Sequence, residues 1–210
     1  MILCDIGNTF LHFYQNGRVW KERADKILSQ FQNQEIFYIS VSRRGEEAFL
    51  KKFPYAISLE TFGVLDTAYI GLGVDRKCAC MAVEDGVVVD AGSAITVDIM
   101  QNGVHLGGYI LPGIASYLKL FSGISERLKI MPNLSLDLDL MPQNTKEAIS
   151  LGILKSIVGF IQEQAKGKRI YFSGGDGKFF SKFFKNSIYN EILVFEGMLK
   201  AVEKYRESRL

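Results

Sequence analysis

Apolar runs separated by short polar turns occur twice in the same arrangement along the chain. Residues 2–4 and 87–89 are apolar, and each run is followed by Asp, one further residue and Gly. A second apolar run and an Asn-Gly pair follow each copy, at residues 16–17 and 102–103. Asn-Gly between two apolar runs is typical of a tight hairpin turn. The pattern therefore predicts strand, tight loop, strand and hairpin turn at two places.

The rest of the chain alternates short apolar runs with longer segments that have apolar residues at helical spacing. The short runs predict strands at residues 35–41, 56–59, 169–172 and 191–195. The helical spacing predicts helices at residues 24–33, 44–53 and 145–165, after Gly113, after Gly177 and at the C-terminus. Residues 78–83 are compatible with either a strand or a helix. Alternating strands and helices are typical of an α/β protein.

Three further segments are defined by turn or capping residues. Gly and Pro at residues 107–113 predict a loop that opens a helix, and residues 135–142 predict an exposed loop. Residues 66–77 are rich in turn residues. Asn144, with Glu147 three residues later, resembles a capping box. A long helix is therefore expected to begin directly after Asn144.

The repeated pattern indicates two related lobes. Its second copy begins near Gly86, which divides the chain into residues 1–85 and 86–210. A chain of 210 residues, 48% of them hydrophobic, is large enough for one domain or two small lobes. We expect two lobes whose Gly-containing loops face each other.

The Asp and Gly at each strand end suit a nucleotide polyphosphate. A backbone approaches a dense anion closely only where no Cβ intervenes, as at Gly7 and Gly92. Backbone N–H groups and small hydroxyls then donate to phosphate oxygens. Carboxylates repel phosphate, so Asp5 and Asp90 are expected to bind a cation that bridges between carboxylate and phosphate. The alternative is two ordinary hairpins with turn-forming Asp and Gly, and the repetition favours the nucleotide.

Composition and charge exclude several classes of partner. The net charge is +2 and the sequence pI is near 8.3, which is too mild for a nucleic-acid-binding surface. No apolar run approaches the roughly 18 residues of a membrane span. The apolar start is interrupted by Asp5 and has no basic leader, so no signal peptide is expected.

The cysteines and histidines do not form a metal-binding pattern. Cys78 and Cys80 are two residues apart, which is the wrong spacing for a C-x-x-C motif. We expect buried free thiols, which suit a reducing cytoplasm. His12 and His105 are the only histidines, and neither has potential ligands nearby in the sequence at metal-binding spacing. A transition-metal site is therefore not expected.

Six short motifs follow one another in a fixed order and are spread over most of the chain. They are Asp5-Ile6-Gly7-Asn8-Thr9, Gly73-Val74-Asp75-Arg76, Asp90-Ala91-Gly92-Ser93-Ala94, Gly107-Gly108 with Pro112-Gly113, Asn144-Thr145 and Ser173-Gly174-Gly175-Asp176. Together they resemble type III pantothenate kinase, of the superfamily of acetate and sugar kinases, heat-shock chaperones and actin. The resemblance implies an α/β fold of two ribonuclease-H-like lobes with ATP in the cleft between them. It also implies phosphorylation of pantothenate, the first committed step towards coenzyme A.

The resemblance assigns the substrate to the Gly-x-Asp-Arg segment. Asp75 is the expected general base, because a carboxylate can orient the substrate hydroxyl and accept its proton. Its alternative role is a turn residue paired with Arg76. The fork of Arg76 suits the substrate carboxylate, and stabilisation of the transferring phosphate is the alternative. The implied substrate-binding residues are Tyr69, Gly73, Val74, Asp75, Arg76 and Thr145.

The resemblance assigns ATP and its cations to the two Gly loops. The implied nucleotide-binding residues are Asp5, Ile6, Gly7, Asn8, Thr9, Phe10, Leu11, His12, Gly92 and Ser93. Asp5 is expected to bind Mg²⁺, directly or through water. Asp90 is expected to bind a monovalent cation, potassium or ammonium. Residues 173–177 either run beside the base or ribose of the nucleotide or form a plain strand-to-helix turn. Ser93 stands where the family usually has Thr, and the chain is shorter than typical members, with the region before Gly73 trimmed.

A homodimer is also expected. The helix after Asn144 is apolar over a wide arc, and Gly152 and Gly159 would let another helix approach closely. The alternative is a helix buried within its own lobe. By resemblance, Thr145 contacts substrate across the dimer interface, and helix capping is its other possible role.

Two other functions compete with the pantothenate kinase. One is a regulatory member that keeps the ATP-binding lobes but has lost catalysis and acts as an accessory factor for transcription. The retained Asp75-Arg76 pair disfavours it. The other is a sugar or acetate kinase of the same superfamily, which the Gly-x-Asp-Arg segment and the short chain disfavour.

Overall fold

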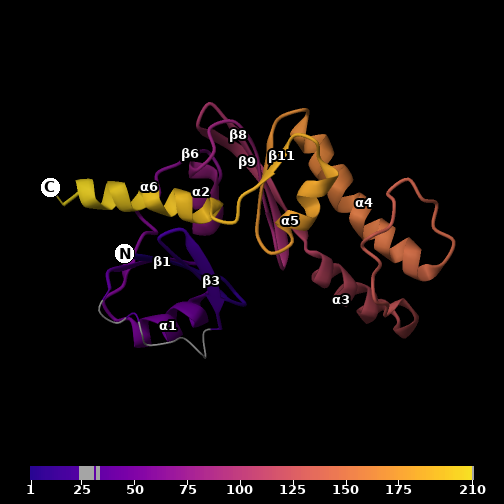
Figure 1. The fold of residues 1–210 in the computed structure, drawn as a ribbon, viewed down its shortest axis with the longest axis horizontal. Helices are drawn as coiled ribbons and strands as arrows, with labels where there is room; N and C mark the ends of the chain where they lie inside the picture. The colour runs from indigo at the N-terminus through magenta and orange to yellow at the C-terminus, as the bar shows by residue number, and fades with distance from the viewer. Residues whose placement is uncertain (24–30, 32–33, 210) are drawn as a thin grey trace. The chain divides into compact units, whose positions relative to one another are not determined.

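The computed structural model describes residues 1–23, 31 and 34–209, and the chain forms two compact units (Figure 1). Unit 1 comprises residues 1–85, 100–107 and 190–210, and unit 2 comprises residues 86–99 and 108–189. The helix expected over residues 24–33 lies outside the described residues. The division into lobes of residues 1–85 and 86–210 stays a prediction.

A five-stranded sheet carries the first copy of the repeated pattern. Its strands are β1 (Ile2–Ile6), β2 (Leu11–Gln15), β3 (Arg18–Glu22), β4 (Ile36–Ser40) and β5 (Ile57–Ser58). Their order is β3-β2-β1-β4-β5. Strand β2 pairs antiparallel with β1 and β3, whereas β4 pairs parallel with β1 and β5. Helix α1 (Arg43–Lys52) links β4 to β5 and confirms the helix predicted there.

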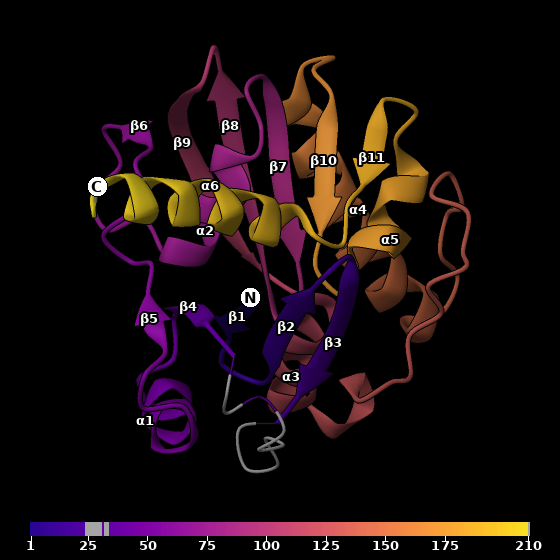
Figure 2. The same cartoon turned by 60° about the vertical axis from the view of Figure 1, so that its left-hand side comes forward.

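A six-stranded sheet carries the second copy. Its strands are β6 (Asp66–Thr67), β7 (Gly86–Ala91), β8 (Ala94–Gln101), β9 (Val104–Pro112), β10 (Ile170–Ser173) and β11 (Ser187–Tyr189). Their order is β11-β10-β7-β8-β9-β6, and Figure 2 shows these strands side by side. Without β6, this is the order of the first sheet, with β7 in the place of β1. The sequence repeat therefore corresponds to a repeat of the sheet topology.

Both predicted hairpin turns are confirmed. Asn16 and Gly17 have φ angles of 49° and 82°, and Asn102 and Gly103 have φ angles of 51° and 75°. Two successive positive φ angles are the signature of the tight turn that matches the twist of paired strands. Asn and Gly adopt them at little steric cost, so the sequence fixes each turn locally.

Helices α2 (Val74–Met81) and α6 (Leu193–Glu207) pack against each other in unit 1. Of the ambiguous residues 78–83, residues 78–81 belong to helix α2. The strand predicted at residues 191–195 is wrong, because β11 ends at Tyr189 and Leu193 begins α6. Leu193, Val194 and Phe195 are buried on this helix. A short apolar run does not separate a buried strand from a buried helix.

The helices of unit 2 follow the predicted order. They are α3 (Ile114–Ile124), α4 (Thr145–Ala165) and α5 (Gly177–Phe180), with single turns at Glu126–Leu128 and Ser181–Phe183. The loop predicted at residues 107–113 is wrong in its first part, because residues up to Pro112 extend β9. Within the described residues, no helix is long and apolar enough to cross a membrane.

Helix α4 begins as the capping signal predicts. Asn144 Oδ1 accepts from the Glu147 N–H at 3.0 Å. Glu147 Oε2 accepts from the Gln143 N–H at 3.0 Å, one residue before the cap. The buried apolar residues of α4, including Leu154, Ile157 and Ile161, belong to the core of unit 2. The helix is therefore covered within its own unit and does not need a second chain to bury its apolar arc.

Candidate functional site

The first Gly loop projects from the end of β1 in unit 1. The Gly7 N–H donates to the Phe10 carbonyl at 3.1 Å, which closes a tight loop with Asn8 and Thr9 exposed at its tip. The side chains of Ile6 and Leu11, by contrast, lie in the core. Any nucleotide contact from these two residues must therefore use their backbone.

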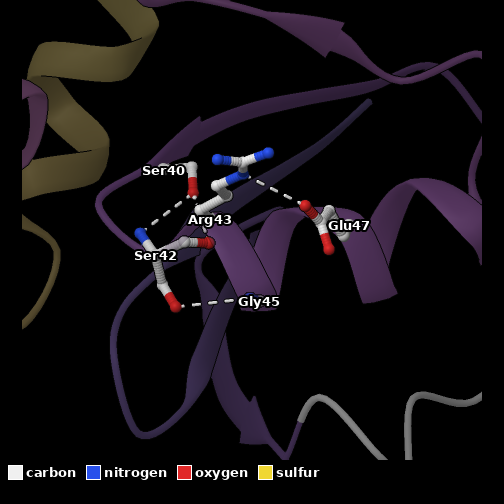
Figure 3. Close-up of polar contacts among 5 residues, drawn as sticks. All are labelled: Ser40, Ser42, Arg43, Gly45 and Glu47. Atoms are coloured by element: carbon white, nitrogen blue, oxygen red, sulfur yellow. Dashed lines mark hydrogen bonds and ion pairs between the residues drawn. The ribbon is translucent and has the colours of Figure 1, made fainter.

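The start of helix α1 lies beside this loop. Ser40 Oγ accepts from the Ser42 N–H at 3.2 Å, and Ser42 Oγ accepts from the Gly45 N–H at 3.3 Å (Figure 3). Arg43 forms an exposed ion pair with Glu47 at 3.2 Å. A cavity of about 310 Å³ separates helix and loop. Its lining includes Gly7, Asn8, Thr9, Arg23, Ser42, Arg44 and Gly45. The structure thus adds polar and basic groups of α1 to the predicted phosphate loop.

Asp5 and Asp75 approach the same buried thiol. Burial, together with the charges of the Asp5 and Asp75 carboxylates, raises the pKa of Cys78 to about 12. Asp75 lies in the first turn of α2, where its Oδ1 accepts from the Arg76 N–H at 2.7 Å. A Cβ at Gly73 would lie 2.6 Å from that oxygen, so a larger residue at this position would displace the Asp75 carboxylate. The carboxylate assigned to Mg²⁺ and the one assigned to proton transfer thus both lie in unit 1, and both act electrostatically on Cys78.

Arg76 and Tyr69 form one contact surface. The Arg76 side chain is buried, with 7% of the residue exposed, and its Cζ lies 4.9 Å from the centre of the Tyr69 ring. Arg76 Nη1 also donates to the Tyr69 hydroxyl at 3.4 Å. A guanidinium stacked on an aromatic ring is held in a fixed orientation. Although the segment before Gly73 is short, it therefore still places Tyr69 in contact with Arg76.

His12 pairs with Asp5 across β1 and β2. Burial lowers the pKa of the His12 imidazole, the charge of Lys21 lowers it further, and Glu191 opposes the shift. The neutral form is therefore favoured at neutral pH. A neutral imidazole does not compete with a cation for the Asp5 carboxylate.

The second Gly loop follows β7 in unit 2. The Gly113 N–H donates to the Ser93 carbonyl at 3.1 Å, and Ser116 Oγ donates to the same oxygen at 2.7 Å. These bonds fix the loop against the start of α3. Ser93 itself stays exposed, so its hydroxyl is accessible to a ligand.

Asp90 lies against the loop at residues 173–177. Gly174 has a φ of +81°, and a Cβ there would lie 2.3 Å from Asp90 Oδ1 and 2.4 Å from the Ala91 carbonyl oxygen. The Asp176 N–H donates to the Ala91 carbonyl at 2.9 Å. Burial raises the pKa of Asp176. Two oxygens thus pack against Gly174, where no side chain fits, and oxygen donors suit a hard cation.

Thr145 is the first residue of α4 and is exposed. Its neighbour Asn144 supplies the helix cap. Capping therefore does not account for Thr145.

Sequence reasoning missed two residues that lie beside Tyr69. Thr67 Oγ1 and His105 Nδ1 are 2.7 Å apart, and the Tyr69 and His105 ring centres are 5.9 Å apart. Ligand atoms of His105 and Cys80 also lie within 4.8 Å of each other. These contacts join residues distant in the sequence, and no local pattern indicates them.

Comparison with known proteins identifies the family. A sequence model described as type III pantothenate kinase matches residues 61–167. A type III pantothenate kinase of Wolinella succinogenes is 54% identical over 209 residues, covering 100% of both chains. One of Helicobacter hepaticus is 50% identical over 204 residues, covering 97% of this chain and 99% of the relative.

Solved structures agree on the fold. A Campylobacter jejuni structure named as a Baf family transcriptional activator is 45% identical, with a TM-score of 0.87 over 99% of this chain and 100% of that chain. MreB 5 of Spiroplasma citri has a TM-score of 0.50 at 12% identity, covering 100% of this chain and 98% of that chain. The second likeness concerns the actin-like fold alone. On the sequence match and full-length identity, the chain belongs to the type III pantothenate kinase family.

Proposed function

We propose that this protein transfers the γ-phosphoryl group of ATP to the hydroxyl of pantothenate, the first step towards coenzyme A. The supporting observation is the contact of Arg76 with both Asp75 and Tyr69, in the same unit as Asp5, in a chain from this family. A carboxylate base, a substrate-binding arginine and a second carboxylate for a metal are the groups that phosphoryl transfer to an alcohol needs.

Asp75 acts as the general base in this proposal. Its carboxylate accepts the proton of the pantothenate hydroxyl as the oxygen attacks the γ-phosphorus, and the bond to the β-phosphate oxygen breaks. Asp5 would hold Mg²⁺, whose charge offsets that of the phosphates. Gly7, Asn8 and Thr9 donate to the phosphates through their backbone and side chains.

Arg76 and Tyr69 bind the carboxylate end of pantothenate. The burial of Arg76 strengthens this interaction, because a charge-assisted bond gains strength where water is excluded. Stabilisation of the transferring phosphate is the second role open to Arg76. Binding assays with substrate analogues separate the two roles of Arg76. An analogue that lacks the carboxylate would bind more weakly only if Arg76 binds the carboxylate.

Direct assay of the purified protein tests the proposed function. With ATP and Mg²⁺, we expect phosphorylated product from pantothenate and background turnover with acetate and simple sugars. Turnover of a sugar or acetate in place of pantothenate would contradict the substrate. No turnover of any of them would instead favour a regulatory protein, as the name of the Campylobacter structure suggests for that protein.

A monovalent cation at Asp90 is the second part of the proposal. The converging Asp90 and Ala91 oxygens beside Gly174 support it. We expect activity in potassium or ammonium chloride and poor activity in sodium chloride of equal ionic strength. Asp90→Asn should lower activity and remove the difference between the salts. Equal rates of the unmodified protein in sodium and potassium would contradict a selective site.

We also propose a homodimer in which Thr145 completes the pocket of the partner. Exposed Ile110, Leu120 and Ile124 line a hollow of about 860 Å³ in unit 2. On α4, a Cβ at Gly152 or Gly159 would meet nothing within 4 Å, so a second helix could approach closely. Apolar exposure on this scale favours a partner surface.

Mixed variants test the shared pocket. Asp75→Asn and Thr145→Trp should each be nearly inactive alone. In a heterodimer one pocket carries both changes and the other carries neither. Random pairing should therefore restore up to about a quarter of the unmodified activity. A monomer by light scattering, or no recovery after demonstrated subunit exchange, would contradict the arrangement.

The buried thiols support a proposal about the compartment. Cys4, Cys78 and Cys80 are buried and form no disulfide. We propose that the protein works in a reducing compartment such as the cytoplasm.

A further inference from the structure

We infer that His105 and Thr67 are positioning residues that hold Tyr69 and Arg76 in the geometry that binds the substrate carboxylate. This inference rests on the proposed function. None of the sequence motifs includes either residue. The contacts that carry it all lie in unit 1.

The segment before Tyr69 is attached to the rest of unit 1 by a very short strand. Strand β6 contains only Asp66 and Thr67, and it pairs parallel with β9 so that Thr67 lies opposite His105 (Figure 2). Beyond it, Ala68, Ile70 and Gly71 are exposed, and Gly71 has a positive φ of 76°. A strand of two residues offers few backbone bonds, so side-chain contacts decide where this segment lies.

Thr67 connects this strand to Tyr69. Its Oγ1 accepts from the Tyr69 N–H at 3.0 Å and contacts His105 Nδ1 at 2.7 Å. A hydroxyl has one proton and two lone pairs, so both bonds can exist together. The backbone of Tyr69 is therefore fixed through Thr67 to an imidazole on another strand.

The side chain of His105 is buried and packed, so it gives these bonds a fixed partner. Only 1% of the residue is exposed, and its ring packs near the Tyr69 ring at 5.9 Å. Tyr69 in turn stacks on the Arg76 guanidinium. A contact chain thus runs from His105 through Thr67 and Tyr69 to Arg76. Loosening it should displace the carboxylate-binding groups and leave the nucleotide loop and Asp75 unaffected.

Thr67 gives the sharper test, because His105 also lies close to Cys80 and has other interactions. Thr67→Val removes the hydroxyl and keeps the shape, and Thr67→Ser keeps the hydroxyl. Thr61→Val, at an exposed position of the same unit, controls for the loss of a threonine hydroxyl. His105→Phe keeps a ring beside Tyr69 and removes the nitrogen.

We expect His105→Phe to raise KM for pantothenate about tenfold, the effect of losing one well-placed bond. Thr67→Val should raise it by at least as much, because it also removes the bond to the Tyr69 N–H. KM for ATP and kcat should change less than about threefold. Thr67→Ser and Thr61→Val should resemble the unmodified protein. Both changes remove the bond between Thr67 and His105, and Thr67→Val also removes the bond to the Tyr69 N–H, so the loss in the double variant should stay well below the product of the two single losses. Calorimetric titration of pantothenate without nucleotide should show the same loss of affinity.

Two results would overturn the inference in an active enzyme. One is an unchanged KM for pantothenate in Thr67→Val, and the other is a double variant whose loss reaches the product of the two single losses. If His105→Phe does not fold, the Val and Ser pair at Thr67 still decides the question. Failure of the unmodified protein to bind or turn over pantothenate would refute the proposed function, and this inference with it.

Discussion

Asp75→Asn is expected to lower kcat for pantothenate phosphorylation by about 10²–10⁴-fold, the usual contribution of a general base. The substitution is nearly isosteric and removes the group that accepts the proton. The side-chain oxygen of asparagine can still accept from the Arg76 N–H, as Asp75 does at 2.7 Å. Helix α2 should therefore keep its first turn, and the loss should lie in catalysis rather than in folding.

Steady-state kinetics with a nucleotide-binding measurement checks this prediction. Asp139→Asn, at an exposed loop position of unit 2, is the matched control and should change kcat little. The thermal midpoint of Asp75→Asn should stay close to that of the unmodified protein. A loss under about threefold, with ATP binding intact, would assign the base to another residue.

Gly197→Ala is expected to be the most destabilising single-methyl substitution that we consider. A Cβ at Gly197 would lie 1.8 Å from the Cys78 carbonyl oxygen and 2.4 Å from its carbon, so helices α2 and α6 would have to separate. Overpacking of this kind costs about 1–3 kcal/mol, and a backbone clash lies at the upper end. The midpoint of thermal unfolding should fall by roughly 6 °C or more.

Gly152→Ala is the matched control for this change. It is also a Gly-to-Ala change within a helix, but its Cβ would meet nothing within 4 Å. Measured at a protein concentration where the chain is monomeric, it should raise the stability by about 0.5–1 kcal/mol, because alanine favours the helix over glycine. Thermal unfolding followed by circular dichroism compares the two. Equal midpoints for both variants would contradict the close helix contact.

The same contact links stability to the candidate site. Helix α2 carries Asp75 and Arg76 in its first turn, and α6 packs on its later part. Separation of the two helices should displace both side chains. We therefore expect the folded fraction of Gly197→Ala to have a raised KM for pantothenate.

Local signals in the sequence determined much of the fold. The two Asn-Gly pairs fixed two hairpin turns, since these residues adopt positive φ at little cost. Asn144 fixed the start of α4 through a bond three residues away. The repeated strand-and-loop pattern predicted two related strand–loop–strand units, which the two sheets contain, because strand period and turn chemistry act over a few residues. The motif order indicated the family in the same way, which the comparisons confirmed.

Only the tertiary structure decided the features that depend on distant contacts. Residues 191–195 have an apolar pattern that suits a strand, yet burial against α2 makes their second half the start of a helix. The contacts of Arg76 with Tyr69, and of Thr67 with His105, likewise depend on which strands and helices become neighbours. Hydrophobic periodicity specifies which face of an element is buried but not what covers it. The partners of the site residues are therefore set by the packing of the whole unit.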